Sequence, residues 1–213
     1  MEKPIIATTL SGLFIRTEPW ARAHILWLKE ASEQLNDPAI MDWADKPNYF
    51  DCVEPIMSKL YPQLNKEERV IKAREIYFDS VCKYIQQNQN VVNQEIVKYF
   101  QSLKEKYTLV LITTNTKEAI DRILALAKLN ELFDIIETSL PTEKDDKRLV
   151  FDRFLKKYEP PITYIGGSRK DSFNYCAERG IKAIFANLEA EQEIPNVQAV
   201  HDIKELKEII SQI

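Results

Sequence analysis

Histidine and cysteine are scarce in this chain of 213 residues, and their scarcity excludes the commonest transition-metal sites. The two histidines, His24 and His201, are too few and too far apart for a histidine-based metal cluster. The three cysteines, Cys52, Cys82 and Cys176, are odd in number and lack the spacing of metal-binding pairs. We therefore expect buried free thiols and a cytoplasmic, reducing location.

Long apolar runs and a basic charge balance are also missing. The longest runs, such as Leu109-Val110-Leu111-Ile112, are too short to span a bilayer, and the first residues lack the apolar region of a signal peptide. The net charge is −4, so neither nucleic acid nor an anionic membrane is expected as a partner. The length suits one domain, or one domain with a modest insertion.

Short apolar runs alternate with helical patterns over most of the chain, which has only four glycines. A first strand at residues 4–8 leads into a loop of small hydroxylated residues that ends at Gly12. Further strands are expected at residues 107–112, 133–136, 162–165 and 182–185, and helices at residues 92–106, 117–128, 146–158, 171–179 and 203–210. This alternation predicts right-handed βαβ units, and therefore an α/β fold with a parallel sheet.

Residues 15–90 interrupt the alternation with a block that contains no convincing strand. Its periodicity predicts helices at residues 17–35, 48–61 and 66–87. We therefore predict a core made of residues 1–14 and 91–213, with residues 15–90 as an inserted helical unit. The block is rich in aromatic residues: Trp20, Trp27, Trp43, Tyr49, Phe50, Tyr61, Tyr77 and Phe78. Most of these should form a small core, whereas an exposed subset would indicate a face for a protein partner.

The order of these features resembles the haloacid dehalogenase (HAD) superfamily, which consists mainly of phosphatases and related phosphoryl-transfer enzymes. The matching features are the first loop with Gly12, the helical block, a strand followed by Thr114-Asn115, a lysine-bearing loop, and Gly166-Gly167-Ser168 followed by Asp171. The resemblance spans essentially the whole chain. It implies a Rossmann-like core whose parallel sheet is flanked by helices, with a helical cap inserted after the first strand.

The resemblance also implies a site at the carboxyl ends of the strands. In this family an aspartate on the first loop attacks phosphorus, and a second aspartate two residues later acts as acid and base. A Ser or Thr and a Lys hold the phosphoryl group, and acidic residues after the fourth strand help to bind Mg²⁺. The metal and the lysine thus offset the phosphate charge.

Both aspartates of the first loop are replaced in this chain, by Thr9 and Ser11, and the first aspartate anywhere is Asp37. The metal-binding aspartate after Gly166 is Gly167, although the later acidic position survives as Asp171. A Thr hydroxyl is a weak nucleophile without an adjacent base, so the aspartyl-phosphate mechanism cannot operate here. The resemblance therefore implies no catalytic residue and no Mg²⁺ site, with Asp171 as the one candidate ligand left.

The anion-holding half of the site is retained. The hydroxyl position falls on Thr114, with Thr113 as a close alternative, and the lysine position falls on Lys144, with Lys147 as the second choice. The predicted ligand-binding residues are therefore Thr9, Ser11, Gly12, Thr114, Asn115 and Lys144.

Each of these residues also has a purely structural interpretation. Thr9 and Ser11 could merely fill a former carboxylate pocket, and Thr114 could cap the helix near residue 117. Lys144 lies in a charged loop that is by default solvated. Asp171 could begin its helix, where a negative charge is favourable.

Three functions follow as competing hypotheses. The favoured one is a non-catalytic protein that binds a phosphorylated or anionic small molecule, or a protein partner through the helical cap. The second is a weak or atypical phosphatase or hydrolase that uses a different catalytic group. The third is a structural subunit with a vestigial cleft.

Overall fold

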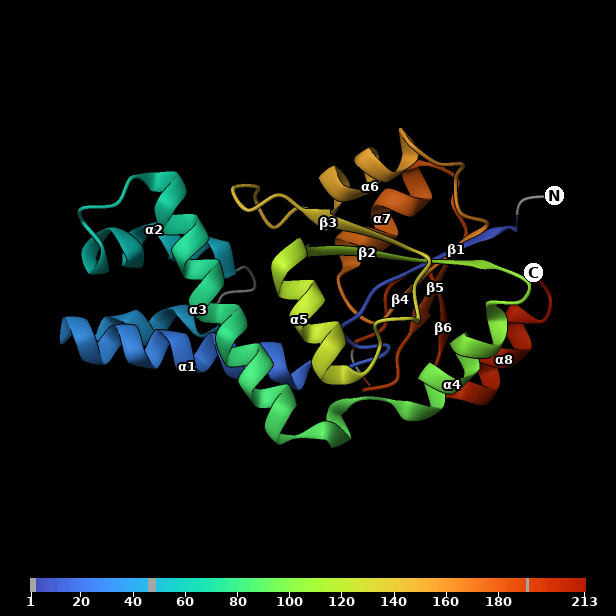
Figure 1. Cartoon of the computed structure of the whole chain (residues 1–213), viewed down its shortest axis with the longest axis horizontal. Coiled ribbons are helices and arrows are strands. Elements are labelled where there is room, and N and C mark those ends of the chain that lie inside the picture. The colour runs from blue at the N-terminus through green and yellow to red at the C-terminus, as the bar shows by residue number, and fades with distance from the viewer. Residues whose placement is uncertain (1–2, 46–48, 191) are drawn as a thin grey trace.

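Six parallel strands form the centre of the molecule, in the order β3-β2-β1-β4-β5-β6 (Figure 1). The computed structural model describes residues 3–45, 49–190 and 192–213. The strands are β1 (Ile5–Thr8), β2 (Thr108–Thr116), β3 (Ile135–Ser139), β4 (Thr163–Gly166), β5 (Ala183–Ala186) and β6 (Gln198–Val200). The predicted parallel α/β sheet is confirmed.

Helices cover both faces of this sheet and form a three-layered core. The helices α4 (Gln94–Leu103), α5 (Lys117–Ala127) and α8 (Ile203–Ile210) pack on one face, and α6 (Lys147–Leu155) and α7 (Lys170–Glu178) on the other. Successive strand residues serve opposite faces, because side chains alternate along a strand. In β1, for example, Ile6 belongs to the first cluster and Ala7 to the second.

Three strand predictions need correction, the first being β3, which was expected at residues 133–136 and runs from Ile135 to Ser139. The edge strand β6 was not predicted, because a three-residue run with an exposed Gln198 carries no periodic signal. It forms by pairing with β5, a long-range contact. Strand β2 continues to Thr116 instead of ending at residue 112, so Thr113, Thr114 and Asn115 belong to the strand itself.

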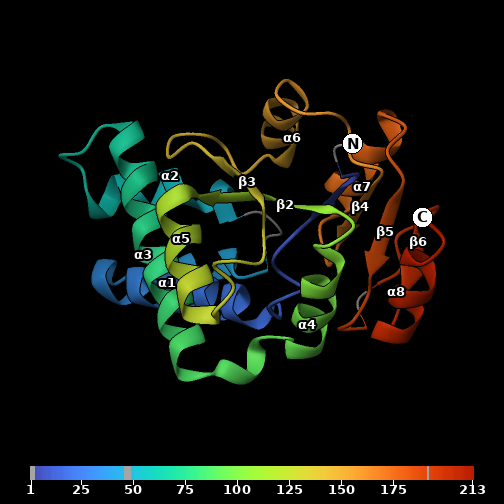
Figure 2. The same cartoon turned by 45° about the vertical axis from the view of Figure 1, so that its right-hand side comes forward.

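Residues 15–90, called the helical insertion from here on, contain no strand among their described residues. Their helices are α1 (Glu18–Leu35), the 3₁₀ helix η1 (Pro38–Trp43), α2 (Tyr49–Leu60), α3 (Lys66–Gln87) and the 3₁₀ helix η2 (Gln89–Val91). Part of the insertion has its own apolar cluster, which includes Trp27, Ile56 and Met57. Phe78, Val81 and Ile85 of α3 instead join the main core, so α3 packs along α5 (Figure 2).

The chain enters and leaves the helical insertion at one place. Ile15 pairs with Val92 in an antiparallel bridge, the Arg16 N–H donates to the Val91 carbonyl at 2.9 Å, and the Asn93 N–H donates to the Phe14 carbonyl at 2.8 Å. These contacts hold the two ends of the insertion together next to the loop that follows β1.

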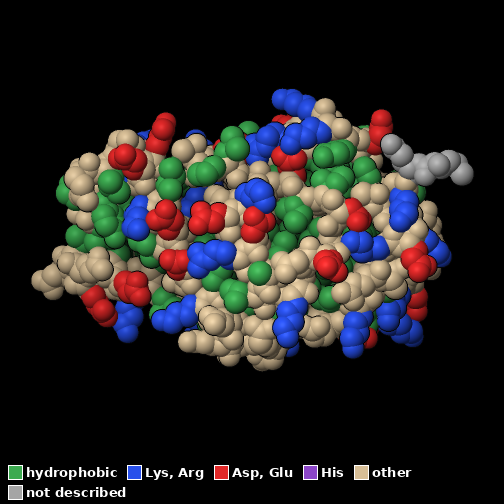
Figure 3. Space-filling model, in the orientation of Figure 1, with side chains coloured by type: hydrophobic (Ala, Val, Ile, Leu, Met, Phe, Trp, Pro, Cys, Tyr) green, Lys and Arg blue, Asp and Glu red, His purple; other side chains and the backbone are tan. Residues whose placement is uncertain are grey.

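The charges on the surface and the state of the three cysteines are as the composition led us to expect. Basic and acidic side chains are interspersed over the face seen in Figure 3. No helix in the described part of the chain has the length and apolarity needed to cross a membrane. Cys52, Cys82 and Cys176 are buried free thiols, as expected.

Candidate functional site

A cavity of about 240 Å³ lies where the carboxyl ends of the strands meet the helical insertion. From the sheet side it is lined by Thr9, Leu10, Ser11, Thr113, Thr114, Asn115, Asp145, Lys147, Ser168 and Arg169, and from the insertion by Trp20, Phe50, Arg74, Tyr77 and Phe78. The cavity adjoins a larger open cleft of about 1110 Å³. Carboxyl ends of parallel strands are the usual position of ligand sites in such sheets.

Thr9 and Lys147 form the buried centre of this cavity. Thr9 directly follows β1, and its backbone N–H donates to the Ile165 carbonyl at 3.1 Å, which ties the first loop to β4. The Lys147 side chain donates from Nζ to the Thr9 hydroxyl at 3.0 Å and to the Tyr164 hydroxyl at 2.9 Å. Both of these hydrogen-bond partners of the buried ammonium are hydroxyls, not carboxylates.

The burial of Lys147 has an electrostatic consequence. Only 3% of the residue is exposed. Burial, and next the charge of Arg169, lower the pKa of Lys147 from its ordinary value of 10.5 to about 7. The amine can therefore gain or lose its proton near neutral pH.

The lysine that lines the cavity is Lys147, the second choice from the sequence, and not Lys144, the first choice. Lys144 is exposed and lines the outer cleft but not the cavity that contains Thr9. Lys147 shares one face of α6 with Val150, Phe151 and Phe154, because residues three, four and seven positions apart lie together on a helix. The sequence contained this signal, since Lys147 continues the buried apolar stripe of that helix.

The hydroxyl position is Thr114, at the end of β2. Its hydroxyl accepts a hydrogen bond from the Arg169 guanidinium at 3.3 Å. The interpretation of Thr114 as the cap of the next helix is wrong, because Thr116 accepts from the Ala119 N–H and caps α5. Thr113 is buried and its hydroxyl accepts from the Asn115 N–H at 3.2 Å.

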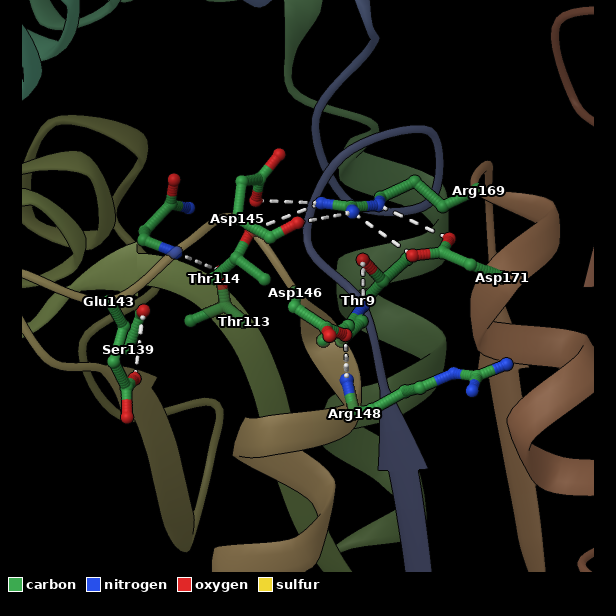
Figure 4. A network of polar contacts seen from close by, with 12 residues as sticks. Thr9, Thr113, Thr114, Ser139, Glu143, Asp145, Asp146, Arg148, Arg169 and Asp171 are labelled. Atoms are coloured by element: carbon green, nitrogen blue, oxygen red, sulfur yellow. Dashed lines mark hydrogen bonds and ion pairs between the residues drawn. The ribbon is translucent and has the colours of Figure 1, made fainter. Parts of the chain in front are cut away.

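Arg169 is a site residue that sequence reasoning missed. Its guanidinium donates to the Asp145 carboxylate at 2.8 Å and to the Asp171 carboxylate at 3.0 Å (Figure 4). Burial opposes its charge, but these two carboxylates outweigh burial and raise the pKa of Arg169 above its ordinary value. Asp171 lies in the first turn of α7 and lines the outer cleft rather than the cavity.

The insertion contributes Arg74 and an aromatic wall. Arg74, on α3, donates to the Thr114 carbonyl at 3.1 Å and to the Glu143 carbonyl at 2.6 Å, and its guanidinium lies 4.7 Å from the centre of the Phe50 ring. Four of the eight aromatic residues singled out in the sequence line the cavity: Trp20, Phe50, Tyr77 and Phe78. Trp27 is buried in the core of the insertion, Trp43 and Tyr61 pack against that core, and the Tyr49 side chain lies outside the described residues.

The backbone below the cavity is packed too closely for a side chain. Gly12 has φ +76°, and a Cβ added to Gly167 would lie 2.2 Å from the Gly12 carbonyl carbon. The loops after β1 and β4 thus meet backbone to backbone. Gly12 contributes this close approach rather than a cavity wall, since it is absent from the lining residues.

The model of one family, described as haloacid dehalogenase-like hydrolase, matches residues 44–182. The chain belongs to the haloacid dehalogenase-like hydrolase family. No curated relative matches the sequence.

Several solved structures share the fold of essentially the whole chain. A haloacid dehalogenase-like family hydrolase from Streptococcus pneumoniae is 17% identical with a TM-score of 0.65, and 98% of each chain is covered. A predicted phosphatase from Clostridium acetobutylicum is 16% identical with a TM-score of 0.63, and 100% of each chain is covered. A β-phosphoglucomutase from Clostridium difficile is 16% identical with a TM-score of 0.63, and the match covers 100% of this chain and 98% of the other.

Within this haloacid dehalogenase-like fold, the cavity brings together Thr9, Ser11, Thr114 and Asn115 as the sequence predicted, together with Lys147, Arg169 and Arg74. Lys144 does not line the cavity. Asp171 does not line it either, but it binds Arg169, which does. The arrangement can hold an anion with fixed cations and hydroxyls. Neither residue at the two aspartate positions of the first loop has a carboxylate.

Proposed function

We propose that this haloacid dehalogenase-like protein binds a small phosphorylated or otherwise anionic molecule in its cavity without performing aspartyl-phosphate chemistry. The observation that carries the proposal is the buried amine of Lys147, which faces the hydroxyl of Thr9 at 3.0 Å. A buried charge is costly unless an opposite charge accompanies it. A bound anion would provide that charge and restore the proton on Lys147.

The shape and lining of the cavity support the size and chemistry of the ligand. A volume of about 240 Å³ suits a small molecule, and Arg74, Lys147 and Arg169 supply more basic than acidic side chains to the wall. Trp20, Phe50 and Tyr77 add apolar surface to the same wall. A phosphate or carboxylate group attached to a small organic body matches this division.

The test compares two lysines that lie three residues apart. Thermal unfolding is followed with inorganic phosphate, small phosphate esters and neutral analogues, all in EDTA. Anions that bind the native state should raise the melting temperature of the wild type and of Lys144→Met, because ligand binding stabilises the folded protein. The Lys147→Met variant should lose this stabilisation, since the buried cation is gone.

Two outcomes would contradict the proposal. Either no anion stabilises the wild type, or Lys147→Met responds as strongly as Lys144→Met does. A cavity that binds nothing would favour a structural subunit with a vestigial cleft, or a protein partner bound through the helical insertion.

A second candidate function is an atypical hydrolase, and the Thr9–Lys147 pair favours it. In its neutral form, Lys147 could accept the Thr9 proton while the hydroxyl oxygen attacks a substrate, and pass that proton to the leaving group as its bond breaks. Water, deprotonated by Lys147, would then cleave the threonine ester and restore the Thr9 hydroxyl. Thr9→Ala separates the two functions in the same protein preparations. Turnover by the wild type that disappears in Thr9→Ala supports the hydrolase, whereas anion binding that persists without turnover supports the binding protein.

A further inference from the structure

The haloacid dehalogenase-like family implies a Mg²⁺ ion at the carboxyl ends of the strands, and the residues of this chain do not provide its usual ligands. Mg²⁺ sites in proteins rely on one or two carboxylates together with water and phosphate. Thr9 and Gly167 stand where the resemblance expects carboxylates. Gly167 cannot be replaced by a residue with a side chain unless the loops separate, because its Cβ would lie 2.2 Å from the Gly12 carbonyl carbon.

The two carboxylates that remain nearby, Asp145 and Asp171, are already bound to a cation of the protein. Arg169 donates from Nε and one terminal nitrogen to Asp171 at 3.4 and 3.0 Å. Its terminal nitrogens also donate to the carboxylate and the backbone carbonyl of Asp145 at 2.8 and 3.1 Å, and to the Thr114 hydroxyl at 3.3 Å. These contacts match the five N–H donors that a guanidinium possesses.

Every atom in this shell is an oxygen. Carboxylates, a backbone carbonyl and a hydroxyl are the ligand types that hard divalent cations bind. Figure 4 shows Asp145, Asp171 and Thr114 turned toward Arg169 from three separate segments of the chain. The guanidinium therefore satisfies an oxygen-lined shell that could otherwise attract a metal ion.

The backbone of Arg169 is held in an uncommon conformation. Its φ is +71°, in the left-handed region where a residue with a Cβ is strained by about 1–2 kcal/mol. Glycine would adopt this φ without that strain. The contacts of the guanidinium supply a reason for an arginine to stand at this position.

We propose that the Arg169 guanidinium is the resident cation of this site, occupying Asp145 and Asp171 so that the protein binds no divalent metal ion there. An intramolecular cation has a high effective concentration and excludes a dissolved competitor. The anion-binding cavity beside it is therefore metal-independent. This proposal concerns metal binding alone, so its test does not depend on whether the cavity binds an anion.

The experiment removes the guanidinium and measures metal binding directly. The variant Arg169→Gly suits the positive φ, and Arg169→Asn provides a second variant, because asparagine also tolerates this conformation. Free Mn²⁺ is followed by electron paramagnetic resonance as each protein is added, and circular dichroism checks that the variants are folded.

Wild-type protein should leave the free Mn²⁺ signal unchanged through the low millimolar range. At least one of the two variants should produce a saturable loss of that signal, because oxygen ligands of Asp145, Asp171 and Thr114 are released. Adding Asp171→Asn to that variant should abolish the new binding.

Two results would overturn the inference. The first is saturable Mn²⁺ binding by the wild type that Asp171→Asn removes. The second is folded Arg169→Gly and Arg169→Asn proteins that bind no more Mn²⁺ than the wild type, which would mean that the guanidinium is not what excludes the metal.

Discussion

At the scale of single residues, the lysine inside the cavity has the most direct consequence for stability. The pKa of Lys147 is about 7 in the folded protein against an ordinary 10.5, so between these values the unfolded chain binds more protons than the folded one. Stability rises with pH wherever the unfolded state binds more protons. The buried Lys147 should therefore destabilise the folded protein less and less as the pH rises from 7 toward 10, so the free energy of unfolding should increase over this range.

This prediction is tested by comparing the wild type with Lys147→Met in urea unfolding at pH 7, 8 and 9. The free energy of unfolding of the wild type should rise relative to that of the variant, with a limiting slope of about 1.4 kcal/mol per pH unit. Burial raises the pKa of Cys176 and of Tyr164, which acts in the opposite direction, but both proteins contain these residues. A difference that stays flat over this range would show that Lys147 keeps its proton in the folded state.

Single residues also show the limit of motif matching. That Thr9 and Ser11 stand where the resemblance expects aspartates could be predicted from the sequence, because it needed only the position of the first loop. The choice between Lys144 and Lys147 depended on which of them turns inward: Lys144 lies exposed in the loop before α6, whereas Lys147 is buried at the start of that helix. The apolar stripe of that helix predicts Lys147, whereas spacing from the neighbouring motifs alone favoured Lys144.

At the scale of elements, the contact between the loops after β1 and β4 fixes the base of the site. Gly167→Ala should lower the free energy of unfolding by roughly 1–3 kcal/mol or more, because the new methyl group would meet the Gly12 backbone at 2.2 Å. Gly180→Ala is the control, since its Cβ would meet nothing within 4 Å, although its φ of +67° adds strain of about 1–2 kcal/mol.

Chemical denaturation of Gly167→Ala and Gly180→Ala compares their free energies of unfolding. Phosphate titration of the same two variants compares their anion binding. Gly167→Ala should weaken anion binding as well as stability, because the loop that presents Thr9 has to move. Equal stability losses without any change in binding would mean that the close approach of the two loops does not position the site.

Among the elements, those with a strong period were predicted well. Helix α3 has the predicted bounds, whereas β2 and β6 differ from prediction. Strand β6 has only three residues, and β2 extends through threonines and an asparagine that lack an apolar pattern. Both depend on pairing with a neighbouring strand, which is not encoded in the local periodicity.

At the scale of the whole molecule, Arg74 links the helical insertion to the sheet domain. It reaches from α3 to the carbonyls of Thr114 and Glu143, across the wall of the cavity. Arg74→Met should increase amide hydrogen exchange at the end of β2 and weaken anion binding, because the hydrogen bonds to the Thr114 and Glu143 carbonyls are lost.

Arg69→Met is the matched control on the same helix. Arg69 pairs with Glu54 inside the insertion at 2.6 Å, so its loss should loosen the insertion while leaving exchange at Thr114 and Asn115 unchanged. The same increase of exchange at β2 in both variants would contradict a specific role for Arg74.

Apart from the short strand β6, the sequence by itself determined the order of the strands, the parallel α/β class and the helical block after the first strand, and its resemblance to the family implied that carboxylates are missing at residues 9, 11 and 167. The elements follow from local periodicity, whereas the missing carboxylates follow only from the comparison with the family's motifs. Only the tertiary structure decided that the Lys147 amine meets the Thr9 hydroxyl, that Arg169 holds Asp145 and Asp171, and that Gly12 meets Gly167. Apart from the Arg169–Asp171 pair, these contacts join segments far apart in the chain, where the folding of the sheet, and not any local pattern, brings the atoms together.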